Sequence, residues 1–174
     1  MVKNKEGSLL APTREIVDWT SNEYTNESLV DAEVRRQFEV CHGCRRCFNL
    51  CDSFPTLFDL IDNSPNESVD DLSNKDFENV TDKCTLCDMC FMTKCPYVPP
   101  HEFNIDFPHL MLRYRALQDK KNKLANTPKQ LAKIDRNAKL AALAPNFVNW
   151  TSNKKNKITR KPLEVFSGID ANTE

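Results

Sequence analysis

Eight cysteines constrain this chain more than any other feature, because all of them lie in two short runs. Each run contains the spacing Cys-x-x-Cys-x-x-Cys, and a fourth cysteine follows after three or four further residues. The first run consists of Cys41, Cys44, Cys47 and Cys51, and the second of Cys84, Cys87, Cys90 and Cys95. Every cysteine of the 174-residue chain belongs to one of these quartets, so any fold for this sequence has to account for both.

The repeated spacing is typical of ligands for 4Fe–4S clusters. Three thiolates separated by two residues allow one tight loop to hold three irons of a cubane, and the fourth iron takes a more distant cysteine. In proteins with two clusters, that distant ligand comes from the other run. The spacing therefore predicts two 4Fe–4S clusters with all eight cysteines as metal ligands, one held by Cys41, Cys44, Cys47 and Cys95 and the other by Cys84, Cys87, Cys90 and Cys51.

Two other uses of the cysteines remain open. Two structural zinc sites would also take eight thiolates, although zinc sites generally draw Cys-x-x-Cys pairs from separate segments rather than three ligands from one loop. Four disulfides would require an oxidising compartment. The apolar stretch at residues 9–11 is too short for a signal-peptide core, and no run of about 18 apolar residues is present. We therefore expect a cytoplasmic protein with reduced thiols, either free or held at the inner face of the membrane through a partner.

Helical periodicity dominates the chain and no segment alternates with a period of two, so the predicted fold class is all-α. Ser28 and Asp31 resemble a capping box and predict a helix over residues 29–40. Prolines from Pro96 onward predict an extended segment before the next helix. Further helices are expected over residues 54–61 and 73–83, after an N-cap at Asp106, from Thr127 to Pro145, and over 156–166 with an interruption at Pro162.

Charge divides the chain into an acidic part that bears the cysteines and a basic part without them. Residues 1–110 hold 10 Lys/Arg and 20 Asp/Glu, whereas residues 111–163 hold 14 Lys/Arg and two Asp. We expect an N-terminal arm over 1–27, a cysteine-bearing domain over 28–105 and a basic helical extension over 106–174. The basic residues alternate with apolar helical positions, which indicates first a solvated face, second a surface that docks on an acidic partner or an anionic membrane, and only third a nucleic-acid site.

Glycine is scarce, and this excludes two classes of nucleotide site. Only Gly7, Gly43 and Gly168 are present, so neither a G-x-G-x-x-G dinucleotide turn nor a Walker phosphate loop can be built. Gly43 is expected to supply a positive φ or a close backbone approach within the first run. The sequence contains no acid–base pair or nucleophile constellation, so it predicts no catalytic residues. Any catalysis would belong to a partner.

The stretches CHGCRRCFNLCDSFP and CTLCDMCFMTKCPYVPPHEFNIDFPHLM carry a family resemblance. They are similar to the α-helical ferredoxin domain of the anaerobic glycerol-3-phosphate dehydrogenase C subunit, the glycolate oxidase iron–sulfur subunit and heterodisulfide reductase subunits. Two local departures are Asp52 in place of the usual proline and one additional residue between Cys90 and Cys95. In addition, no cysteine follows Cys95, so the Cys-Cys-Gly repeats of longer family members are missing.

The resemblance implies a function in electron transfer. The implied role is an iron–sulfur protein or subunit that takes electrons from a flavoprotein dehydrogenase of the glycerol-3-phosphate or 2-hydroxy-acid type. It would pass them through two 4Fe–4S clusters towards a quinone or another acceptor, without a transmembrane segment and without binding nucleic acid. The alternative from another class is a zinc-stabilised interaction module whose basic helices bind a partner or nucleic acid.

Overall fold

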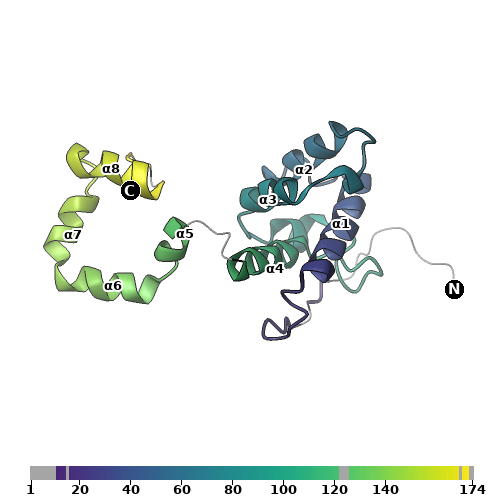
Figure 1. Ribbon diagram of the computed structural model, residues 1–174, viewed down its shortest axis with the longest axis horizontal. Helices are drawn as coiled ribbons and strands as arrows, with labels where there is room; N and C mark the ends of the chain where they lie inside the picture. The colour runs from purple at the N-terminus through teal and green to yellow at the C-terminus, as the bar shows by residue number, and fades with distance from the viewer. Residues whose placement is uncertain (1–10, 15, 122–125, 169, 173–174) are drawn as a thin grey trace. The chain divides into compact units, whose positions relative to one another are not determined.

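The computed structural model describes residues 11–14, 16–121, 126–168 and 170–172, except for the side chains of Lys94 and Pro128 (Figure 1). The chain forms two compact units, Met1–Asn122 and Lys123–Glu174. Every regular element among the described residues is a helix, so the all-α prediction is confirmed for this part of the chain. In the same residues, no helix is both long and apolar enough to cross a bilayer.

The first helix, α1, spans Glu27–Cys44 and is longer at both ends than the sequence predicts. Its N-cap is Asn26, whose side chain accepts a hydrogen bond from the backbone N–H of Leu29. The expected capping box is therefore wrong, because Asp31 instead pairs with Arg35 one turn further along the helix. The helix ends at Arg45, whose left-handed φ of 51° breaks the helical run inside the first cysteine quartet.

Two short helices follow the first quartet. Helix α2 spans Ser53–Asp62 and packs against α3, which spans Asn74–Lys83. The segment between them contains one 3₁₀ turn, η1, at Val69–Asp71. At the N-cap of α3, the Asp76 carboxylate accepts from both the backbone N–H and the hydroxyl of Ser73, which confirms the helix start predicted there.

Helix α4, Phe107–Lys120, closes the first unit. The Asp106 side chain caps it by accepting from the backbone N–H of His109, as the sequence predicts. The residues before it, 96–105, form turns rather than the expected extended segment. Because α4 packs against α1 and α3, the first compact unit extends to Asn122, past the boundary expected after residue 105.

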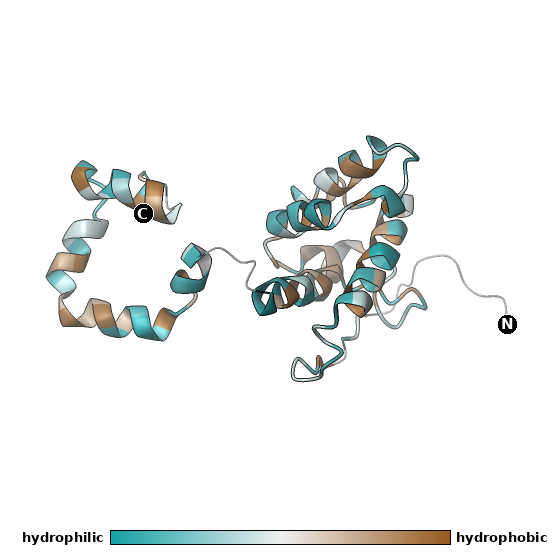
Figure 2. Cartoon of the chain, viewed as in Figure 1, coloured by the Kyte–Doolittle hydropathy of each residue, from teal (hydrophilic) through white to brown (hydrophobic). Residues whose placement is uncertain are grey.

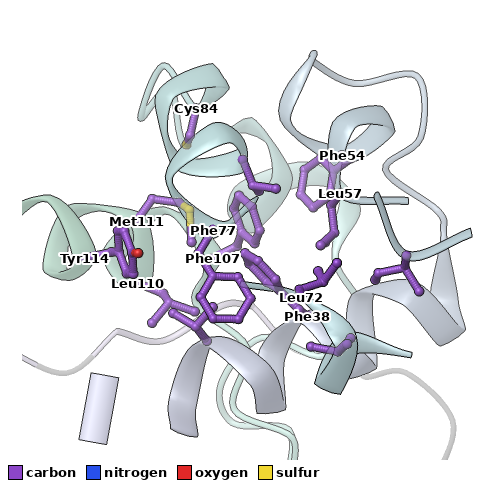
Figure 3. Packing of buried hydrophobic residues seen from close by; sticks show 14 of the residues in the cluster. Phe38, Phe54, Leu57, Leu72, Phe77, Cys84, Phe107, Leu110, Met111 and Tyr114 are labelled. Carbon is purple, nitrogen blue, oxygen red and sulfur yellow. The ribbon is translucent and has the colours of Figure 1, made fainter. Parts of the chain in front are cut away.

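Aromatic rings from four helices build the core of the first unit (Figure 3). The Phe38 ring packs edge-on against Phe77, with centroids 5.6 Å apart, and nearly parallel to Phe107 at 5.9 Å. Phe107 in turn contacts Phe54 at 4.6 Å. Rings from α1, α2, α3 and α4 therefore meet in one cluster, and the two cysteine runs are attached to helices whose relative positions this cluster sets.

The second unit has a different character. It comprises α5 (Asn126–Leu131), α6 (Ile134–Leu143), α7 (Pro145–Ser152) and α8 (Lys157–Ser167). The single helix expected up to Pro145 is therefore divided, Pro145 begins a helix instead of ending one, and Pro162 lies inside α8. Among the described side chains of this unit only Arg160 is buried, so its apolar residues remain on the surface (Figure 2).

Candidate metal centre

The eight cysteines lie at helix ends of the first unit or, as Cys87 does, in the loops next to them. Cys41 and Cys44 belong to the last turn of α1, and Cys47 and Cys51 follow in the turns before α2. Cys84 caps the C-terminus of α3, and Cys90 begins a π-helical turn, η2, that spans Cys90–Lys94. Cys95 follows this turn directly, and its backbone N–H donates to the carbonyl of Cys90. All eight side chains are free thiols.

One small hollow is lined by four cysteines from both runs. Three come from the first run, and the fourth is the last cysteine of the second: Cys41, Cys44, Cys47 and Cys95. The rest of its wall is mostly apolar and includes Phe54, Phe58, Tyr97 and Ile105. The structure thus brings together the four residues that the spacing assigns to one cluster.

A second small hollow shows the reciprocal arrangement. Its cysteines are Cys84, Cys87 and Cys90 from the second run and Cys51 from the first. Phe54 lines this hollow as well as the first, so one aromatic ring forms part of both walls. A third hollow, lined by Cys41, Cys47, Cys90 and Cys95, joins thiols of both quartets. That these residues ligate iron stays a prediction.

The spacing of the thiols bears on which metal group they could hold. Within the described residues, no three His, Cys, Asp or Glu side chains converge as a ligand set for one ion. A cubane binds each thiolate through a different iron, so its ligands surround a volume rather than a point. Each of the two hollows is lined by four thiols, which are donor atoms of the kind that such a cluster takes.

Burial favours the protonated form of four of these thiols, those of Cys41, Cys84, Cys90 and Cys95. Burial raises the pKa of Cys41 well above its usual range, and the neighbouring Cys95 and Cys47 raise it further. Burial likewise raises the pKa of Cys84 and of Cys90. Thiolate ligation at such positions requires a bound positive charge, which a metal supplies when it displaces the protons.

Backbone N–H groups also point towards sulfur in the second run. The backbone N–H of Met89 donates a hydrogen bond to the exposed Cys87 side chain and thereby lowers the pKa of this thiol. Two residues of this loop adopt left-handed φ angles, Leu86 at 55° and Asp88 at 60°. Successive N–H groups in such loops form concavities that bind anions, including the sulfur of iron–sulfur sites. Gly43, expected to have this role in the first run, lies instead within α1.

The sequence does not predict the ion pairs that two arginines form near the cysteines. Arg45, which follows Cys44, donates to the Asp62 carboxylate of α2. Arg14 from the N-terminal arm donates to Asp88, a residue of the second cysteine loop. No sequence signal marks Arg14, because 74 residues separate it from its partner.

Comparisons with known proteins give one partial relative. The chain is similar to citrate utilization protein B of Escherichia coli. The two are 32% identical over 85 residues, which is 49% of this chain and 20% of the relative. This chain thus spans about a fifth of the relative's length. No family model matches the sequence, and no solved structure matches it. The eight cysteines and the distant relative are consistent with an iron–sulfur protein.

Proposed function

We propose that this chain is an electron-transfer protein or subunit that holds two 4Fe–4S clusters. The observation that carries the proposal is the pair of hollows, each lined by three cysteines of one run and the last cysteine of the other. Such an exchange of the fourth ligand is the arrangement of two-cluster ferredoxins. It ties the two runs together, and the Phe54 side chain lines both sites.

The residues of the chain would bind, orient and protect the clusters. One cluster would be held by Cys41, Cys44, Cys47 and Cys95, and the other by Cys51, Cys84, Cys87 and Cys90. A bound 4Fe–4S cluster supplies reversible one-electron chemistry. Aromatic and aliphatic side chains around both hollows exclude water, and a dry surrounding helps to set the reduction potential.

A flavin-dependent dehydrogenase of the glycerol-3-phosphate or 2-hydroxy-acid type is the proposed donor. A reduced flavin holds two electrons, and two one-electron sites in series can take them singly and pass them towards a quinone or another acceptor. Exposed side chains beside the second hollow, Cys87, Met89 and Met92, offer an edge for contact with such a partner. The name of the similar protein refers to citrate utilization, and citrate, like the 2-hydroxy acids, is a small organic acid.

The metal content of the protein tests the proposal directly. We expect the full chain, purified without oxygen, to be brown and to contain about eight iron and about eight acid-labile sulfide. Electron paramagnetic resonance should show reversible one-electron reduction, as expected of carriers rather than of structural clusters. Stoichiometric zinc without sulfide would contradict the proposal and would favour the zinc-stabilised interaction module. Clusters that cannot be reduced reversibly would contradict the electron-transfer role alone.

A further inference from the structure

The N-terminal arm reaches the second cysteine run through one side chain, that of Arg14. Its guanidinium donates to both carboxylate oxygens of Asp88, at 2.9 and 3.1 Å, and to both of Asp106, at 2.7 and 2.9 Å. Bidentate pairs of this kind fix the position of both partners more firmly than a single contact does. Arg14 therefore links the arm to the cysteine loop and to the N-cap of α4.

The same guanidinium lies over the face of an aromatic ring beside the cysteines. The Cζ atom of Arg14 is 3.9 Å from the centroid of the Phe91 ring, a cation–π contact. Phe91 is only 4% exposed and lines the hollow that Cys41, Cys47, Cys90 and Cys95 share. One aromatic ring thus separates a permanent positive charge from the cysteine sites.

Asp88 is the residue of the loop for which this anchoring matters most. It lies between Cys87 and Cys90, lines the second hollow, and has a left-handed φ of 60°. Left-handed conformations cost free energy for residues other than glycine, although Asp tolerates them better than most. The two hydrogen bonds from Arg14 hold the Asp88 side chain and thereby favour the conformation that turns backbone N–H groups towards sulfur.

We propose that Arg14 is a positioning residue that holds the Cys84–Cys90 loop in its liganding conformation and raises the reduction potential of the cluster bound there. This inference rests on the proposed two-cluster function. Reduction adds one negative charge to a cluster, and a neighbouring cation favours the reduced state. The positive charge of Arg14 offsets the negative charges of Asp88 and Asp106. Without Arg14, these two carboxylates near the site would disfavour the reduced cluster.

The test compares Arg14→Gln with a control that loosens the same arm elsewhere. Arg113 of α4 holds the arm through the carbonyls of Glu23 and Tyr24 and bonds to neither Asp88 nor Asp106 through its side chain. In the reconstituted full chain, we expect Arg14→Gln to raise the oxidised-to-reduced ratio at a fixed ambient potential by up to about tenfold, which is about 59 mV for a one-electron step. Arg113→Gln should leave the potential unchanged.

Hydrogen exchange of the backbone amides of residues 84–91 separates positioning from charge. Arg14→Gln should speed this exchange and Arg113→Gln should not. Arg14→Lys keeps the charge but not the planar fork, so it should restore much of the potential while exchange stays fast. Asp88→Asn removes the acidic partner of the Arg14–Asp88 ion pair and should speed hydrogen exchange of the same backbone amides.

Two results would overturn the inference. One is an Arg14→Gln protein with wild-type potential and wild-type exchange. The other is an Arg113→Gln protein that changes as much as Arg14→Gln, since the arm as a whole would then be responsible. A wild-type chain that takes up no iron and sulfide would instead refute the proposed function. The exchange measurement would still decide whether Arg14 holds the loop.

Discussion

Replacing Cys95 with serine is expected to remove about half of the iron and sulfide from the reconstituted protein, because one of two clusters loses its fourth ligand. Cys95 is the last cysteine of the second run in sequence, but in space it lines the hollow of the first run together with Cys41, Cys44 and Cys47. The cluster that is lost or altered should therefore be the one bound by the first run. Iron and sulfide analysis combined with electron paramagnetic resonance of the reduced protein would measure both effects.

A matched set of variants assigns the affected cluster. Cys44 belongs to the same proposed ligand set as Cys95. The cluster that remains in Cys44→Ser should therefore give the same electron paramagnetic resonance spectrum as the cluster that remains in Cys95→Ser. Cys51→Ser and Cys87→Ser line the other hollow and should share a second, different remaining spectrum. The exchange of ligands between runs is wrong if Cys95→Ser instead gives the spectrum of Cys87→Ser.

The Phe38→Ala variant is expected to lower the free energy of unfolding by about 3–5 kcal/mol, the usual cost of removing a buried phenylalanine ring. Phe38 is fully buried in α1, and its ring contacts Phe77 of α3 and Phe107 of α4. The deletion would therefore leave a cavity where three helices meet (Figure 3). Chemical unfolding followed by far-ultraviolet circular dichroism would measure the loss.

The control for this variant is Phe166→Ala in α8. Phe166 is 79% exposed, so the same chemical change should alter the free energy of unfolding by no more than about 0.5 kcal/mol. A loss at Phe38 as small as that at Phe166 would show that the aromatic cluster does not stabilise the first unit. Because the helices of this cluster carry the cysteines, Phe38→Ala should also lower the yield of iron on reconstitution.

Local sequence signals were sufficient to predict a helix end where a single side chain caps it. The caps at Ser73 and Asp106 were predictable, because a carboxylate a few residues from a backbone N–H can reach it in any helix start. The prolines were harder to interpret. The backbone N–H groups of the first helical turn have no partner within the helix, so the N–H that proline lacks is not needed there. Pro145 can therefore begin a helix as readily as it ends one. Ser28 and Asp31 had the pattern of a cap, but Asn26 was better placed.

The cysteine spacing by itself defined two runs of four and predicted the exchange of ligands between them, and the helical periodicity of the apolar residues predicted an all-α chain. Ligand spacing is a local property, because a tight loop brings neighbouring thiols together whatever the rest of the fold does. Only the tertiary structure decided that Phe54 lines both hollows, that α4 belongs to the first unit, and that Arg14 reaches Asp88. Those contacts join residues far apart in the chain. They depend on how the helices pack around the aromatic core that contains Phe38, and no short sequence motif encodes them.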